Sequence, residues 1–352
     1  MRKRLNFRQW LMTKQQILFI FSLLFLLSLC FSLVLGCWSS ERVNNSNNQL
    51  KIADITATKV VRIGHQPHGT MLYLKVRGNL EKRLSPLGIS VEWTQFTAGP
   101  PILAAMGEGK IDIGYGGVVP PIFAQANGVP FVYVANDSPS PESVGILVRE
   151  DSPIRTLADL KGKKITATKS SVAHYMLIQA LIKAGLTLKD VSFIDLPPPE
   201  GQVAFKQGKV DAWIGWHPFL AELQESMPVR VLADGEGLTS NRNFYFATRD
   251  FANNHANTIK IIIEESQNVG TWVTEHPQES AKILTNSMKL NLTTAFTLTK
   301  NRLYEAQPIQ DRAVEEQQRV AETFYRLGLL PKRIWVEDIV WKRALGKWGS
   351  FQ

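Results

Sequence analysis

Three short segments of the sequence offer uncharged hydrogen-bond donors directly after predicted strands. Gly116 and Gly117 precede a predicted helix, and glycine lets a backbone N–H group approach a ligand closely. Ser170 and Ser171 precede another helix, where their hydroxyl groups add to the unpaired N–H groups of the helix N-terminus. Gln66 ends the first strand and can donate through its amide. Each residue also has an ordinary role open to it, as a cap, a turn or a surface side chain, but together they indicate a site for an anion.

Aromatic and imidazole side chains lie near these segments. Trp216 and His217 follow a predicted strand, and His174 lies on the helix after the two serines, where it either lines the pocket or faces solvent. His65, His68 and His217 form a loose set, and histidine is a frequent metal ligand. No Cys, Asp or Glu completes a set with zinc-like spacing, so we expect neither a metal nor a cofactor.

The short motifs of common catalytic sites are missing from the sequence. It contains no Gly-x-Ser-x-Gly elbow, no Walker A loop and no His-Glu-x-x-His pair. No nucleophile lies beside an evident base, so the sequence favours binding of a ligand without catalysis.

Composition excludes other classes of protein. The 352 residues are 44% hydrophobic and 20% charged, which is typical of a globular protein. The formal net charge is +9, but five of the basic residues lie in the first 36 positions, which contain no acid. No concentrated basic stripe remains to bind nucleic acid.

Short apolar runs alternate with amphipathic stretches, a pattern typical of a parallel α/β sheet with helices on both faces. Strands are predicted at residues 60–64, 90–96, 111–115, 129–135, 164–167, 191–195 and 210–214. The sequence Gly-Lys-Ile-Asp at 109–112 is echoed by Gly-Lys-Val-Asp at 208–211, each between a helix and a strand. The echo indicates two similar α/β lobes, whose strand ends would surround a shared crevice.

The later part of the chain, from about residue 257, is mostly helical, and we expect it to pack on the first lobe. One helix is predicted over 70–84, and another near 309–327 would turn Ala313, Val320, Phe324 and Leu327 inward.

The N-terminal segment predicts export. Basic residues are followed by an almost continuous apolar run at 17–35, as in a secretory signal. Gly36 and Cys37 resemble the lipobox of bacterial lipoproteins, so we predict a signal peptide over 1–36, acylation of Cys37 and a flexible tether over 37–59. An uncleaved anchor is the alternative, since about 19 apolar residues can span a bilayer. We expect a periplasmic protein held at the outer face of the cytoplasmic membrane, or a soluble periplasmic one.

Several runs of sequence resemble the aliphatic sulfonate-binding proteins of ABC transporters, which are related to taurine and nitrate binders. The matching runs lie in order at residues 96–100, 114–126, 156–164, 211–213, 216–218, 324–325 and 330–332. The resemblance implies a periplasmic-binding-protein type II fold, in which two α/β lobes joined by a two-strand hinge close on a ligand in the cleft between them. It places the hinge near 143–148 and 241–248, which divides the folded part into a first lobe at 60–145, a second lobe at 146–243 and a return to the first lobe at 244–352. It also implies a monomer that works with an ABC permease.

The resemblance also carries ligand-binding roles onto this chain. They fall on Gln66, Gly116, Gly117, Ser170, Ser171, Trp216 and, in addition, Tyr245.

Two acids of the family pattern are missing here. Gly116, Gly117 and Val118 stand where the family commonly has Thr-Gly-Asp, and His217 stands where it commonly has Asp between Trp and Pro. If both positions face the pocket, it should bind an amine-free organic anion in preference to zwitterionic taurine. If both face away, the pocket is unchanged. A protonated His217 would add affinity for an anion at low pH.

The sequence therefore predicts a binding protein that captures an aliphatic sulfonate or a related organic anion and delivers it to a permease, with no chemistry on the ligand. Nitrate, bicarbonate, taurine or a thiamine-precursor pyrimidine are alternative ligands. An enzyme on the same fold is the remaining alternative, because the fold also resembles that of pyrimidine-precursor and menaquinone-pathway enzymes.

Overall fold

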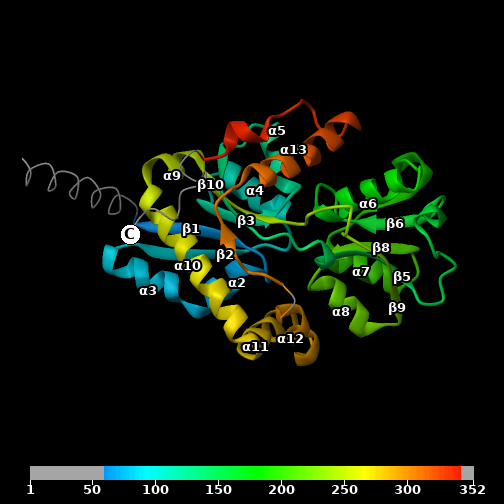
Figure 1. Ribbon diagram of the computed structural model, residues 1–352, viewed down its shortest axis with the longest axis horizontal. Coiled ribbons are helices and arrows are strands. Elements are labelled where there is room, and N and C mark those ends of the chain that lie inside the picture. The colour runs from blue at the N-terminus through cyan, green and yellow to red at the C-terminus, as the bar shows by residue number, and fades with distance from the viewer. Residues whose placement is uncertain (1–58, 301, 342–352) are drawn as a thin grey trace, which may run out of the picture. The chain divides into compact units, whose positions relative to one another are not determined.

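The computed structural model describes residues 59–300 and 302–341, which contain two β-sheets (Figure 1). The predicted signal peptide, Cys37 and all of the tether before residue 59 lie outside the described residues. Within the described ranges, none of the helices combines the length and apolarity needed to cross a membrane.

The first sheet has six strands in the order β11-β4-β10-β3-β1-β2. Its strands are β1 (Val60–His65), β2 (Ser90–Gln95), β3 (Ile113–Gly117), β4 (Phe131–Asp137), β10 (Asn243–Thr248) and β11 (Ala306–Gln307). β1 pairs in parallel with β2 and β3, whereas β10 runs antiparallel between β3 and β4. The carboxyl ends of β1 and β3 therefore reach the same edge of the sheet as the amino end of β10.

Four helices follow the first strands: α2 (Thr70–Arg77), α3 (Asn79–Leu84), α4 (Gly99–Gly107) and α5 (Pro120–Ala126). The single helix predicted over 70–84 is broken at Gly78, which adopts a left-handed conformation with φ 65° and caps α2. The helical spacing of apolar residues continues across this break, so periodicity alone does not reveal it.

The second sheet has five strands in the order β7-β6-β8-β5-β9. Its strands are β5 (Val144–Arg149), β6 (Lys164–Ala167), β7 (Ser192–Asp195), β8 (Ala212–Trp216) and β9 (Val229–Asp234), and its helices are α6 (Val172–Lys183), α7 (Pro198–Lys206) and α8 (Phe219–Ser226). β6 is parallel to β7 and β8, which confirms the predicted strand–helix alternation. The two mixed sheets confirm the predicted α/β class.

The chain passes from one sheet to the other through residues 138–143 and back through residues 235–242. The hinge expected at 143–148 and 241–248 is therefore displaced, because those residues lie mostly inside β5 and β10. The crossings come a few residues earlier, where Pro139 and Pro141 interrupt regular pairing.

The remaining helices are α9 (Arg249–Asn254), α10 (Ala256–Glu275), α11 (Pro277–Met288), α12 (Leu292–Lys300) and α13 (Asp311–Arg326). α10 packs on α2 and α3, where Arg83 forms ion pairs with Glu264 and Glu265. The helical C-terminal part contacts helices that follow the strands of the first sheet, and it also touches α6 of the second.

α13 provides the clearest contact between the two halves. Phe324 is fully buried, and its ring centroid lies 5.0 Å from that of Phe123 on α5 and 5.4 Å from that of His174 on α6. Leu327, predicted to face inward, is instead 45% exposed, because α13 ends at Arg326 and the chain turns away at Gly328.

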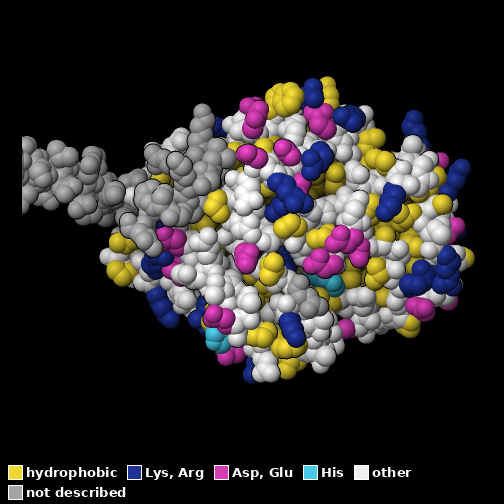
Figure 2. Space-filling model, in the orientation of Figure 1, with side chains coloured by type: hydrophobic (Ala, Val, Ile, Leu, Met, Phe, Trp, Pro, Cys, Tyr) yellow, Lys and Arg dark blue, Asp and Glu magenta, His cyan; other side chains and the backbone are white. Residues whose placement is uncertain are grey.

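On the face drawn in Figure 2, the surface has no continuous patch of positive or negative charge. Lys and Arg side chains there lie among Asp and Glu side chains, and apolar side chains are scattered between them. Single exposed apolar side chains of this kind are ordinary on a soluble protein.

Candidate functional site

A small cavity, which we call the inner cavity, lies between the two sheets and has a volume of about 30 Å³. Five residues singled out from the sequence line it: Gln66, Gly117, Ser171, Trp216 and His217. They come from the ends of β1, β3 and β8 and from the start of α6, so separate strand ends do meet at one place, as the predicted crevice requires.

Four other predicted residues lie outside the lining of this cavity. An added Cβ on Gly116 would lie 3.7 Å from the Gly99 backbone, 3.7 Å from the Phe246 ring and 4.0 Å from Gln66 Nε2. Ser170 has φ 57° and donates its backbone N–H to Nδ1 of His174, 3.3 Å away. His174 is buried and stacks on Phe193, and Tyr245 is fully buried in β10. Ligand-binding roles for these residues stay predictions.

The structure adds lining residues that sequence reasoning missed. They are Gly99, Pro120, Ser143, Val172, Asn241, Asn243 and Arg302, and His68, which the sequence suggested only as a metal ligand, lines the cavity as well. Ser143 and Asn241 lie in the two connecting segments, which a cleft between two sheets must bring close to any ligand. Ser143 and Asn241 could therefore have been predicted from their place in the connecting segments. Arg302 follows α12 in a segment with no periodic pattern, and no signal in the sequence marks it.

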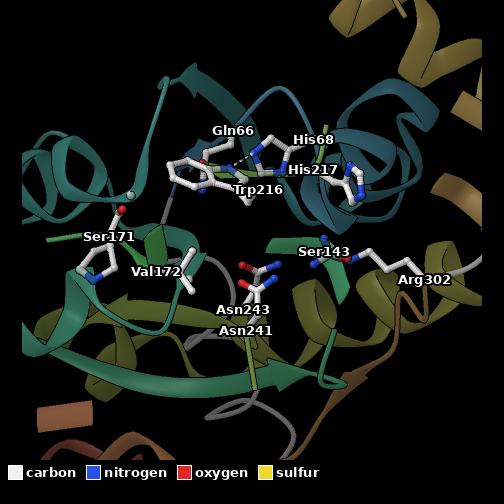
Figure 3. Close-up of a pocket in the computed structure, with 13 residues that line it drawn as sticks. Gln66, His68, Ser143, Ser171, Val172, Trp216, His217, Asn241, Asn243 and Arg302 are labelled. Carbon is white, nitrogen blue, oxygen red and sulfur yellow. Dashed lines mark hydrogen bonds between the residues drawn. The ribbon is translucent and has the colours of Figure 1, made fainter. Parts of the chain in front are cut away.

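Arg302 supplies the one permanent positive charge among the described residues that line the inner cavity. In Figure 3 it enters from the side opposite Ser171 and points its guanidinium towards the middle of the site. Within the described chain, its Nε has no hydrogen-bond partner. Burial opposes its charge, but nearby Tyr115, Tyr304 and Asp137 together raise the pKa of Arg302 above its usual value. The group therefore stays cationic and is available to an anion.

A buried polar network fixes the floor of the site. Tyr115 and Tyr245 donate their hydroxyls to the two carboxylate oxygens of Asp137, the second at 2.9 Å, and Thr70 donates to the same carboxyl at 3.3 Å. Asn243 donates its amide N–H to the Tyr115 hydroxyl at 2.9 Å. Burial raises the pKa of Asp137. Tyr245 thus contributes to the site only through this hydrogen-bond network. The same network orients the Asn243 side chain.

One hydrogen bond crosses from the second sheet to the first. Trp216 Nε1 donates to His68 Nε2 at 3.3 Å (Figure 3). The indole nitrogen is only a donor, so His68 must accept at Nε2 and carry its proton on Nδ1. Burial lowers the pKa of His68 to about 3, and burial next to Arg302 lowers the pKa of His217 to about 4. Both imidazoles are neutral at physiological pH.

Trp216 is held in place by the strand that precedes it. The Trp213 ring lies across Gly215, where an added Cβ would stand 2.0 Å from a ring carbon. Only glycine fits there, so Trp213 packs into the core and the strand delivers Trp216 to the cavity.

Ser171 is the N-cap of α6. Its hydroxyl accepts the N–H of Ala173 at 3.2 Å and donates to the carbonyl oxygen of Thr168 at 2.6 Å. The hydroxyl proton is therefore already used within the protein. The backbone N–H groups at the start of this 12-residue helix remain the natural donors to an anion on this side.

The two positions where the family pattern has an acid differ in this structure. Val118 is buried and does not line the inner cavity, and its carbonyl oxygen accepts a hydrogen bond from Gln317. His217 does line the cavity, and its Nδ1 has no partner within the described chain. Only the second replacement can alter the ligand pocket directly.

The described residues contain no group of three or more His, Cys, Asp or Glu side chains arranged to hold a metal ion. His65, one of the three histidines considered for a metal, instead contacts the Gln66 carbonyl oxygen at 2.8 Å and Lys75 at 3.2 Å.

Comparison with known proteins places the chain in a family. A family model described as NMT1/THI5 like matches residues 86–280. The crystal structure of the periplasmic aliphatic sulphonate binding protein SsuA from Escherichia coli is 35% identical, with a TM-score of 0.75 over 81% of this chain and 92% of that chain. The alkanesulfonate-binding protein SsuA from Xanthomonas axonopodis pv. citri, bound to MOPS, is 34% identical, with a TM-score of 0.76 over 80% of this chain and 98% of that chain.

A more distant structure, that of the desulfurization enzyme DSZB, is 15% identical, with a TM-score of 0.58 over 80% of this chain and 96% of that chain. At that identity the likeness shows the fold alone. The family model spans more than half of the chain, and the two SsuA structures are covered almost in full. The chain belongs to the NMT1/THI5-like family and, within it, groups with the periplasmic aliphatic sulfonate-binding proteins.

Proposed function

We propose that this protein is an extracytoplasmic receptor that captures an organosulfonate and delivers it to an ABC permease without changing it chemically. One observation carries the proposal. The inner cavity is lined by a single cation, Arg302, and by no Asp or Glu among the described residues. A sulfonate is ionised at every biological pH, so it needs donors and a cation rather than a base.

The surrounding donors fit the same ligand. The guanidinium can form charge-assisted hydrogen bonds with sulfonate oxygens, which are stronger than bonds between neutral groups. The start of α6 offers backbone N–H groups and the positive end of a helix dipole on the opposite side of the cavity. Gln66 and Asn241 add side-chain amides to the lining.

The ligand is held without catalysis in this proposal. Among the described lining residues, no serine or cysteine is hydrogen-bonded to a general base: Ser171 caps its helix, and the buried histidines keep low pKa values. The resemblance to binding proteins at 34–35% identity supports the same reading.

Location and anchoring complete the proposal. The basic and apolar N-terminal segment supports export to the periplasm, and Cys37 supports attachment to the outer face of the cytoplasmic membrane through a lipid. The receptor acts as a monomer, which offers one surface from each sheet to the permease.

The experiment is a titration of the full chain, purified in mild detergent, with methanesulfonate, ethanesulfonate, taurine, nitrate and bicarbonate. Calorimetry in a Tris buffer is required, because many common biological buffers are themselves sulfonates. We expect binding of the alkanesulfonates, weaker binding of taurine and no binding of nitrate or bicarbonate. If only nitrate binds, the fold assignment still stands, but the proposal that the ligand is a sulfonate is wrong.

A further inference from the structure

Arg302 lies in a short stretch of chain between two regular elements. α12 ends at Lys300 and β11 begins at Ala306. Arg302 nevertheless lines the inner cavity and two neighbouring spaces beside it. A side chain that binds a ligand has to be held within about 0.5 Å of its productive position. Contacts from outside this stretch must therefore fix its backbone.

Helix α10 makes two contacts with the stretch. Gln267 Nε2 donates to the carbonyl oxygen of Ala306 at 3.1 Å. One turn later Gly270 is buried against the backbone of Tyr304, where an added Cβ would stand 1.8 Å from the carbonyl oxygen and 2.8 Å from the carbonyl carbon. Because positions three apart lie on one face of a helix, α10 presents a single surface to the backbone at 304–306.

The close approach of Tyr304 explains why a glycine lies inside this helix. Gly270 belongs to the 20 residues of α10, where glycine is a poor helix former and alanine is the best. A carbon and a carbonyl oxygen in contact stand about 3.3–3.6 Å apart, so an alanine side chain at position 270 would move the Tyr304 backbone by about 1.5 Å. That displacement is roughly three times the tolerance of a binding site.

Tyr304 transmits the contact with α10 to Arg302. Its ring is buried and packs edge-to-face on Tyr73 of α2, with 5.2 Å between the ring centroids. The guanidinium carbon of Arg302 lies over the Tyr304 ring, 5.5 Å from its centroid, and both residues line the space of about 30 Å³ beside the inner cavity. A shift of the Tyr304 backbone would move its ring, and with it the surface over which the guanidinium lies.

We propose that Gly270 and Gln267 are positioning residues of the anion site. They hold the backbone at 304–306 close to α10, and so place the Arg302 guanidinium at the inner cavity. Neither residue lines that cavity or the spaces beside it, so both act only through Arg302. The inference rests on the proposed function, because it explains how the cation of the binding site is held.

The test is a double-mutant cycle between Gly270→Ala and Arg302→Gln, with ethanesulfonate as the probe and calorimetry of the full chain in Tris buffer. Gly270→Ala should weaken binding at least about fivefold, but no further than Arg302→Gln does, since it displaces the guanidinium without removing it. In a chain that already carries Arg302→Gln, adding Gly270→Ala should change the affinity by less than about twofold, because two residues that act through one group give losses that do not multiply.

Ile259→Ala is the control for lost stability. Ile259 is fully buried on the same helix, but it lies about 16 Å before Gly270 along the helix axis. This variant should lower the melting temperature and leave the affinity within about twofold of the unchanged chain.

Gln267→Leu tests the second contact at a similar side-chain volume. It should weaken binding at least about threefold, and this loss should also disappear in a chain that carries Arg302→Gln. It decides the question if Gly270→Ala does not fold.

The outcomes separate this proposal from the proposed function. Unchanged affinity in the folded α10 variants, or losses that multiply with the loss from Arg302→Gln, would overturn the positioning role and leave the binding function standing. Absence of ethanesulfonate binding in the unchanged chain would overturn the proposed function, and this inference with it.

Discussion

Arg302 determines the charge of the candidate site. It enters from a loop after α12, its Nε has no partner within the described chain, and the other polar groups of the lining are neutral. Arg302 is half-buried, and a cation partly shielded from water binds an anion more strongly than a fully exposed one.

We expect Arg302→Gln to weaken alkanesulfonate binding by about 10- to 100-fold, because a hydrogen bond to a charged group contributes about 1.5–3 kcal/mol. Arg302→Lys should retain part of the affinity, since it keeps the charge but loses the planar fork. Calorimetry measures the affinities, and circular dichroism confirms folding. Affinity within threefold of the unchanged chain in Arg302→Gln would show that the anion lies elsewhere.

Buried histidines predict how the protein responds to pH. The pKa of His68 is lowered to about 3, and the pKa values of His174 and His217 are lowered to about 4, in each case mainly by burial. The unfolded chain binds protons at these positions near pH 6.5 and the folded chain does not, so stability is greatest above that pH and falls as the pH drops towards 4.

The melting temperature should therefore decrease between pH 6.5 and 5, while alkanesulfonate affinity stays level over the same interval because neither His68 nor His217 becomes charged. His217→Gln removes one of the titrating groups, so the melting temperature should depend less steeply on pH. An affinity that rises steeply below pH 6.5 would mean that His217 protonates in the folded protein.

At the scale of elements, variants at the start of α6 can separate a residue's contribution to stability from its contribution to ligand affinity. The Ser171 hydroxyl makes both of its hydrogen bonds within the protein, as the N-cap of the helix. Ser171 nevertheless lies in the lining of the inner cavity. Aspartate is as good a cap as serine, but it adds a negative charge where the ligand's negative charge should lie.

Ser171→Asp should melt close to the unchanged chain and bind alkanesulfonates at least tenfold more weakly, because two like charges about 4 Å apart repel by several kcal/mol at an effective dielectric constant of 20. Ser171→Ala should show the reverse pattern, with stability lowered by about 1 kcal/mol and affinity reduced by only a few-fold. Denaturant unfolding and calorimetry separate the two effects. Equal affinity in Ser171→Asp would place the anion away from α6.

The elements themselves were largely predictable, because their apolar residues repeat at regular intervals. Strands such as β6 and β8 and the capping of the short helix at Leu157–Leu160 by Thr156 follow from local pattern alone. Local pattern does not predict the break at Gly78 or the exposure of Leu327, because the helical spacing of apolar residues continues through both positions.

The site was predictable only where it lies at strand ends. Gln66, Gly117 and Trp216 follow that rule, and the structure brings them to one cavity. The place of Arg302 depends on how helices distant in sequence pack together, as in the apolar cluster that joins Ala221 to Leu284 and Ala295. No local pattern encodes that arrangement.

At the scale of the whole molecule, the two sheets are held together on both sides of the cavity. α13 touches both through Phe324, and α8 touches the α11–α12 pair through Ala221. Between these contacts, the hydrogen bond from Trp216 to His68 crosses directly above the inner cavity (Figure 3). Breaking this bond removes a direct contact between the two sheets beside the cavity.

Trp216→Phe keeps an aromatic ring but removes the donor, so we expect the ligand to dissociate about 2- to 10-fold faster, in line with a net hydrogen-bond contribution of about 0.5–1.5 kcal/mol. His68→Gln keeps an acceptor for the indole and should change the rate less. Stopped-flow displacement of a bound alkanesulfonate gives both rates. Equal rates in the unchanged chain and Trp216→Phe would show that this bond does not hold the cavity closed.

The single guanidinium of the lining also bears on inorganic sulfate, which differs from a sulfonate by a second negative charge. With His68 and His217 neutral, Arg302 balances one charge and no more. A sulfate dianion would keep an uncompensated buried charge, at a cost of several kcal/mol. Abundant sulfate would therefore leave the receptor free, so that a cell could still recover a scarce organic source of sulfur in its presence.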